Sequence, residues 1–214
     1  MFETVHFDWE FIPAQKKSPY LMIVLHGKGD SLRPFRNFDE ELEIKNLNFL
    51  LLNAPKKYLK GYSWYGDPPY QTKGVKKIRE KLLDVLKSLE SLGWDSRKIF
   101  IFGFSQGCLV GADLALNYDK PFAGVIGVSG YFQFFPKWRG KLKDNIKTPW
   151  LLTHGKKDDV LPFGKTKKGA RTLKQAGFKI DFVESNKKHI FDDEEYPLIK
   201  NWVSNVMAEF SHKL

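Results

Sequence analysis

Residues Ile99 to Gly107 read Ile-Phe-Ile-Phe-Gly-Phe-Ser-Gln-Gly. An apolar run of strand length, Lys98–Phe104, leads through a glycine-flanked serine into a segment with helical spacing, Gln106–Tyr118. This G-x-S-x-G pattern between strand and helix is typical of a sharp turn that projects the serine hydroxyl clear of a sheet. The flanking glycines leave room for neighbouring strands, and the helix directs free N–H groups and its positive dipole end toward the serine. The stretch therefore predicts a nucleophilic Ser105 at the end of a buried strand.

The same alternation of short apolar runs and amphipathic segments extends over the rest of the chain. Further runs of strand length are Tyr20–His26, Leu47–Ala54, Gly124–Val128, Trp150–His154 and Lys179–Val183. Further segments with helical spacing are Lys73–Leu92, Lys165–Ala176 and Glu194–Phe210. Continuous apolar strands alternating with helices predict an α/β fold with a mostly parallel central sheet and helices on both faces. Near the N-terminus, Val5, Phe7, Trp9 and Phe11 alternate with polar residues, which predicts an antiparallel strand at the edge of the sheet.

Composition limits the classes of protein to consider. The chain has 214 residues, a net charge of +10, and 18 Phe, 8 Tyr and 6 Trp. This aromatic content supplies enough apolar surface to offset chain entropy, so the charge does not indicate disorder. The length predicts one domain over residues 1–214. A single cysteine, Cys108, excludes an intramolecular disulfide framework, and the acidic N-terminal residues do not resemble a signal peptide, so we expect a cytoplasmic protein.

A serine nucleophile needs a base and an acid that orients the base. In folds with this turn the chain order is serine, acid, then histidine. The histidines that follow the serine are His154, His189 and His212. We select His189 as the base because it lies in a polar loop after the last strand, whereas the first histidine ends a strand before a glycine and the last is near the C-terminus. The acid is expected after the preceding strand, where Asp158 and Asp159 are both candidates and their spacing does not separate them.

Two backbone N–H groups are expected to stabilise the oxyanion. One belongs to Gln106, which follows the serine, and the other to Lys28 in the loop Leu25-His26-Gly27-Lys28-Gly29-Asp30 after an earlier strand. The glycines of this loop let the backbone approach a ligand closely. A phosphate cradle is the alternative interpretation, but the loop has neither the P-loop spacing nor the G-x-G-x-x-G spacing.

Five blocks of sequence occur in order along nearly the whole chain. They are Leu25-His-Gly-Lys-Gly-Asp30, Ser63-Trp64-Tyr65, Gly103-Phe-Ser-Gln-Gly107, Ser129-Gly130-Tyr131 and His154-Gly-x-x-Asp158-x-x-x-Pro162. With these blocks the sequence resembles the carboxylesterase/phospholipase branch of the α/β-hydrolases, the group that includes acyl-protein thioesterases. The resemblance implies the α/β-hydrolase fold, Asp158 as the acid, and hydrolysis of carboxylic esters or thioesters with short to medium acyl chains. It implies no metal and no cofactor. Lys156 and Lys188 depart from the pattern, because many relatives carry an acidic and a small residue there.

Two aromatic segments are expected to shape the acyl site, the long irregular loop Tyr58–Tyr70 and the segment Tyr131–Trp138 after a strand. Long loops in compact domains are usually functional, and aromatic walls suit an apolar acyl chain. The side chains assigned to substrate binding are Trp64, Tyr65, Tyr131 and Phe132. The alternative is that these rings complete the hydrophobic core.

Basic residues form three clusters, two of which flank the aromatic segments. The clusters are Lys56, Lys57 and Lys60; Lys73, Lys76, Lys77, Arg79 and Lys81; and Lys137, Arg139, Lys141 and Lys143. These basic clusters would attract acidic substrates or make transient contact with an anionic lipid surface. The alternative is that they form a solvated face with no binding role. Nothing resembles a nucleic-acid-binding module. The expected partner is therefore a small-molecule or lipid ester. One alternative function is a non-catalytic protein of the same fold that binds lipid or a partner. Another is an acyltransferase or peptidase that uses the same serine, histidine and aspartate.

Overall fold

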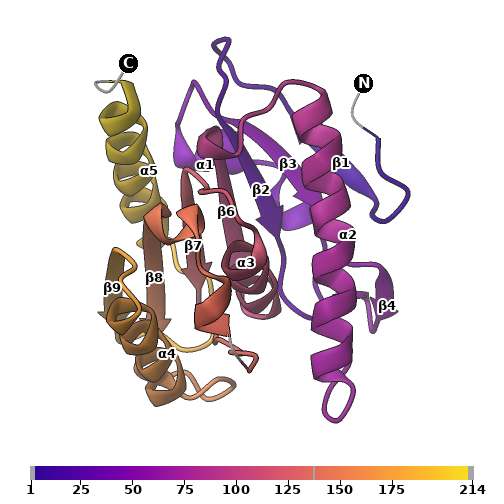
Figure 1. Ribbon diagram of the computed structural model, residues 1–214, viewed down its shortest axis with the longest axis vertical. Helices are drawn as coiled ribbons and strands as arrows, with labels where there is room; N and C mark the ends of the chain where they lie inside the picture. The colour runs from indigo at the N-terminus through magenta and orange to yellow at the C-terminus, as the bar shows by residue number, and fades with distance from the viewer. Residues whose placement is uncertain (1–2, 137, 212–214) are drawn as a thin grey trace.

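A computed structural model describes residues 3–136 and 138–211 of the chain, and within them the core is a seven-stranded sheet (Figure 1). Its strand order is β1-β3-β2-β6-β7-β8-β9. The strands are β1 (Trp9–Ile12), β2 (Leu21–Leu25), β3 (Asn48–Leu52), β6 (Ile99–Phe104), β7 (Gly124–Val128), β8 (Trp150–Gly155) and β9 (Ile180–Ser185). Strand β1 pairs antiparallel with β3, and the other neighbours pair in parallel. The predicted parallel sheet with an antiparallel N-terminal edge strand is confirmed.

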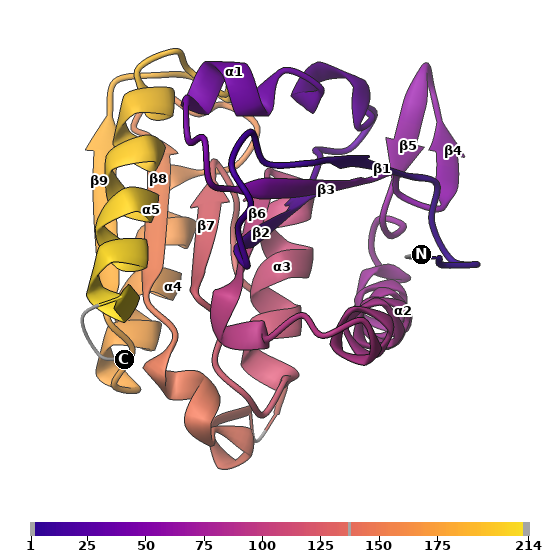
Figure 2. The same ribbon diagram turned by 90° about the horizontal axis from the view of Figure 1, so that it is seen from above.

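Helices cover both faces of this sheet (Figure 2). They are α1 (Phe38–Leu42), α2 (Gln71–Ser91), α3 (Gln106–Asn117), α4 (Phe163–Gln175) and α5 (Glu195–Ser211). Helices α2, α3 and α4 pack on one face and α1 and α5 on the other, so the predicted cover on both faces is confirmed. Helix α3 is buried along almost its whole length at the centre of its face, which suits a segment with few charged residues.

Alternation of side chains along each strand builds the two hydrophobic cores. In β6, Ile99 and Ile101 join the core under α2, α3 and α4, whereas Phe100 and Phe102 join the core under α1 and α5. All four side chains are fully buried, and each contributes about 1.5–3 kcal/mol to the free energy of folding. A strand with large apolar residues on both faces is therefore fixed at the middle of the sheet, with its carboxyl end at the turn that carries Ser105.

Two expectations about local structure need correction. Part of the predicted irregular loop is regular, because β4 (Lys56–Tyr58) and β5 (Gly61–Ser63) form an antiparallel hairpin beside the main sheet. Its turn lacks the usual Asn-Gly signal and places Leu59 at φ 52°. At the N-terminus the edge strand begins only at Trp9, and Val5 is exposed to solvent.

Candidate active site

Ser105 occupies the turn between β6 and α3 with φ 52° and ψ −110°, a conformation that residues other than glycine rarely adopt. Such strain costs about 1–3 kcal/mol and persists only where the surroundings enforce it. Here the Ser105 N–H donates to the Val128 carbonyl (2.9 Å), and its carbonyl accepts the Cys108 N–H (3.2 Å). A Cβ atom at Gly107 would lie 2.1 Å from the Leu25 carbonyl oxygen, so only glycine fits this close approach. The turn thus holds Ser105 rigidly at the end of β6.

Ser105, His189 and Asp158 form a continuous chain of hydrogen bonds. The Ser105 Oγ lies 2.8 Å from His189 Nε2, and His189 Nδ1 lies 2.8 Å from Asp158 Oδ2. An ionised carboxylate only accepts, so the partners assign the imidazole proton to Nδ1 and leave Nε2 to accept the hydroxyl proton. The structure therefore brings together the three side chains selected from the sequence. A base in this position can remove the serine proton during attack on a carbonyl.

Asp158 is oriented by the backbone of its own loop. Its Oδ1 accepts the N–H groups of Val160 (3.0 Å) and Leu161 (2.7 Å), and its side chain is fully buried. Burial raises the pKa of this carboxyl, but the Leu161 N–H and the His189 imidazole outweigh that effect, and the pKa of Asp158 is lowered. The neighbouring Asp159 is exposed to solvent. Of the two candidate acids, Asp158 is the one in contact with the imidazole.

His154 supports the same carboxylate from the interior. Its Nε2 lies 2.9 Å from the Leu161 carbonyl oxygen and 3.2 Å from Asp158 Oδ2. Burial lowers the pKa of His154, so the ring is neutral, and the two oxygen acceptors at Nε2 assign its proton to that nitrogen. This histidine, expected to be packed in a turn, donates to the Asp158 loop rather than to Ser105.

A buried ion pair anchors the loop that carries His189. The Lys187 Nζ lies 2.6 Å from Glu195 Oε2 and donates to the Ile190 carbonyl (2.9 Å). Glu195, the first residue of α5, accepts the Thr153 hydroxyl from β8 with its other oxygen. Burial lowers the pKa of Lys187, and the charge of Glu195 opposes that shift. These contacts attach the loop to the sheet and to α5 on either side of the imidazole.

The two backbone donors selected from the sequence belong to segments that adjoin Ser105. Gln106 is the first residue of α3, so its N–H has no partner in a preceding helical turn. Lys28 follows β2 in a loop that approaches the serine, since a Cβ on Gly27 would lie 3.5 Å from the Ser105 Cβ. The Lys28 ammonium pairs with the Asp67 carboxylate (2.7 Å), so only its backbone is available for an oxyanion.

Side chains around these donors fix their positions. The buried His26 ring donates from Nδ1 to the Gly27 carbonyl (2.6 Å) and accepts the Ala54 N–H at Nε2 (3.0 Å). Burial lowers the pKa of His26, which keeps the ring neutral for these two roles. The Trp64 indole N–H donates to the His26 carbonyl, and the Trp64 backbone N–H donates to the Gln106 side-chain oxygen, each at 2.8 Å. Trp64 therefore joins the loop after β2 to the turn that carries Ser105.

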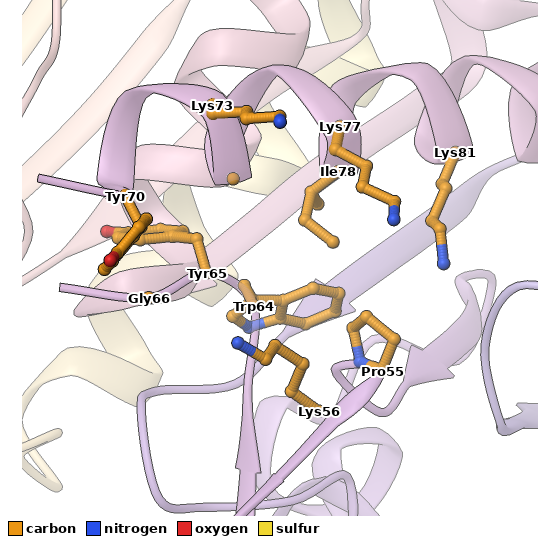
Figure 3. Close-up of a pocket in the computed structure, with 11 residues that line it drawn as sticks. Pro55, Lys56, Trp64, Tyr65, Gly66, Tyr70, Lys73, Lys77, Ile78 and Lys81 are labelled. Carbon is orange, nitrogen blue, oxygen red and sulfur yellow. The ribbon is translucent and has the colours of Figure 1, made fainter.

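The aromatic residues assigned to substrate binding lie in different environments. Trp64 and Tyr65 are buried and line a cavity of about 370 Å³ between α2 and the segment around the β4–β5 hairpin (Figure 3). None of the three hydrogen-bonded catalytic candidates lines that cavity.

The second aromatic segment packs between α2 and α4. The Tyr131 hydroxyl accepts the Gln71 amide N–H (2.8 Å), and the Lys165 ammonium lies 4.2 Å from its ring. Phe132 is buried against Trp150 and leaves room only for glycine at position 169, since a Cβ there would lie 2.2 Å from its ring. A substrate-binding role for these residues stays a prediction.

Several contributors to the site were not selected from the sequence. They are His26, Thr153, Lys187 and Glu195. No local pattern marks them, because their roles depend on how the loops fold: His26 binds Ala54 from 28 residues away and Thr153 binds Glu195 from 42 residues away. His212 and Lys137, named from the sequence, lie outside the described residues. Within residues 3–136 and 138–211, no group of His, Cys, Asp and Glu side chains is arranged to hold a metal ion, and no helix is long and apolar enough to cross a membrane.

Comparison with known proteins gives the family. A probable carboxylesterase of Oryza sativa subsp. japonica is 26% identical over 94% of this chain and 82% of its own length. Acyl-protein thioesterase 1 of Emericella nidulans is 25% identical over 92% of this chain and 94% of its own length. The crystal structure of Arabidopsis thaliana SOBER1 superposes with a TM-score of 0.81 at 23% identity, covering 88% of this chain and 99% of that one, which shows a shared fold. The sequence profile of the phospholipase/carboxylesterase family matches residues 8–207, and the chain belongs to this family.

Proposed function

We propose that this protein hydrolyses carboxylic esters or thioesters of short to medium acyl chains through an acyl-enzyme on Ser105. Family membership makes the chain an ester hydrolase, and the proposal adds the residues and the course of the reaction. The observation that carries it is the hydrogen-bonded chain Ser105–His189–Asp158, with both contacts at 2.8 Å. A protein that only binds a ligand has no need of this arrangement.

In the proposed reaction, Ser105 Oγ attacks the carbonyl carbon while His189 Nε2 takes the hydroxyl proton. The resulting oxyanion accepts hydrogen bonds from the backbone N–H groups of Lys28 and Gln106. The C–O or C–S bond then breaks, and the alcohol or thiol leaves with the proton held by the imidazole. Water repeats the sequence, with His189 as base, to release the acid and restore the serine. Asp158 holds the imidazole in the required tautomer and stabilises its charged form.

The test is a panel of p-nitrophenyl esters and acyl thioesters of increasing chain length, assayed with the wild type and Ser105→Ala. We expect Ser105→Ala to lower turnover by about 10⁴-fold or more. The matched control is Ser204→Ala, an exposed serine in α5, which should keep wild-type turnover. Equal turnover by the wild type and Ser105→Ala would refute the assignment of Ser105, and no turnover by the wild type on any substrate of the panel would favour a non-catalytic binding protein. Acyl transfer to an added alcohol or amine in preference to water would instead identify an acyltransferase or peptidase.

The proposal extends to the domain organisation, cofactor requirement, location and lipid contact of the enzyme. We infer that residues 1–214 form one domain that acts without metal or cofactor in the cytoplasm. A lipid ester substrate would be met by transient contact between the basic clusters and an anionic lipid surface. That contact should weaken as salt concentration rises.

A further inference from the structure

The cavity between α2 and the hairpin segment is rimmed by lysines (Figure 3). Lys73, Lys77 and Lys81 lie four residues apart and so share one face of α2. Lys56, from β4, approaches from the opposite wall. No acidic residue lines the cavity. Four positive charges from two elements therefore surround one hollow of about 370 Å³.

These lysines are unlike many other cations of the chain. Lys87 pairs with Asp84 further along α2, and Lys120 pairs with Glu90 at its end. Among the residues that the structure describes, none of the four cavity lysines forms an ion pair with a carboxylate. Like charges four residues apart also destabilise a helix. The arrangement thus lacks the counter-charge that an anionic ligand would supply.

The interior of the cavity is apolar. Trp64, Tyr65 and Ile78 form its floor but are at most 5% exposed, so its accessible apolar surface comes from the exposed Pro55 and Tyr70. Trp64 and Ile78 belong to the hydrophobic core and are held in place by it. Pockets of 300–1000 Å³ with apolar walls and a few convergent charged groups are typical of small-ligand sites. A ligand that matches both features carries negative charge at the rim and an apolar or ring portion against Pro55 and Tyr70.

We propose that this cavity binds a phosphate ester, with its phosphate among Lys56, Lys73, Lys77 and Lys81 and its apolar portion against Pro55 and Tyr70. Lysine ammonium groups bind phosphate oxygens through charge-assisted hydrogen bonds. The phosphate can come from a soluble ester such as a nucleotide or from the headgroup of a phospholipid. Both sources present the same chemistry to the lysines.

The proposed site is distinct from the ester-cleaving centre but adjoins it. Neither Ser105 nor His189 lines the cavity. Trp64, on the floor, is hydrogen-bonded to the His26 carbonyl and to the Gln106 side chain. A ligand here would lie behind the segment that joins the proposed oxyanion loop to the turn that carries Ser105. Binding at this site does not depend on hydrolysis.

Binding is measured on the Ser105→Ala protein, so the result is independent of the proposed reaction. Calorimetric titration with ATP and with inorganic pyrophosphate probes soluble phosphates. Sedimentation with phosphatidylcholine vesicles, with and without phosphatidylinositol 4-phosphate, probes the lipid source. The test variant carries Lys73→Gln, Lys77→Gln and Lys81→Gln, and the control carries Lys17→Gln, Lys45→Gln and Lys174→Gln, which removes equal charge from exposed positions outside the cavity.

We expect the cavity variant to weaken binding of ATP or of phosphoinositide vesicles by about tenfold or more, and the control to change it less than twofold. ATP should bind more tightly than pyrophosphate, because only ATP carries a ring that can contact the exposed Pro55 and Tyr70. Loss of vesicle binding alone identifies the lipid source, and loss of ATP binding the soluble source. An equal loss in the two variants, or no binding of any probe to the protein with all its lysines, would overturn the proposal.

Discussion

Lys187 and Glu195 form an ion pair of 2.6 Å beneath the loop of His189, with side chains only 2% and 7% exposed. The charge of Glu195 compensates a lysine whose pKa is lowered by burial. The same glutamate accepts the Thr153 hydroxyl, and the same lysine donates to the Ile190 carbonyl. The position of the imidazole therefore depends on one polar cluster that joins its loop, β8 and α5.

Breaking this pair from one side should be costly. Lys187→Met leaves a buried carboxylate without its counter-charge, and we expect the free energy of unfolding to fall by about 3–5 kcal/mol. The double variant Lys187→Met, Glu195→Gln removes both charges and should be more stable than the single variant. Urea unfolding measures both differences. A single variant as stable as the wild type would show that the pair does not anchor the loop.

The close approach of β2 to the turn that carries Ser105 gives a second prediction. Gly107→Ala places a methyl group 2.1 Å from the Leu25 carbonyl oxygen, and we expect it to destabilise the protein by about 3 kcal/mol. The matched control is Gly164→Ala in α4, where the methyl group meets no atom within 4 Å. That change should stabilise the protein by about 0.5–1 kcal/mol because alanine restricts the unfolded chain. Thermal unfolding of the two variants compares them, and equal effects would contradict the packing described here.

The contribution of the Asp158 carboxylate to stability should depend on pH. Because its pKa is lowered in the folded state, the ionised carboxylate stabilises the fold above its unfolded pKa of about 3.9, and this contribution is lost as pH falls through the lowered value. The stability difference between wild type and Asp158→Asn should therefore be largest near neutral pH and shrink below about pH 4. Unfolding by urea at a series of pH values tests this, and a difference that grows on acidification would count against it. The same substitution should lower kcat by about 10²–10⁴-fold, because an amide does not hold the Nδ1-protonated ring.

The sheet could be predicted because its strands are continuous apolar runs. The run at Gly124–Val128 coincides with β7, and Lys98–Phe104 lies within one residue of β6. Other elements carry weaker signals. Helix α1 spans only five residues, too few for helical periodicity, and the β4–β5 turn uses Leu59 and Lys60 rather than Gly or Asn.

The candidate site was predictable only where a local motif marks it. The glycine-flanked Ser105 has such a motif, and the chain order directed attention to His189. Asp158 could not be separated from Asp159 by spacing, because the separation depends on which carboxylate turns inward. The Lys187–Glu195 pair was missed, since a lysine in a polar loop is normally solvated and nothing in the sequence shows that its loop folds over β8.

Covalent labelling of the wild type with a fluorophosphonate, followed by intact mass measurement and peptide mapping, is the sharpest test of Ser105 as the nucleophile. We expect one adduct per chain on Ser105, no adduct in Ser105→Ala, and strongly slowed labelling in His189→Ala. An adduct on a different residue, or undiminished labelling of Ser105→Ala, would contradict this assignment.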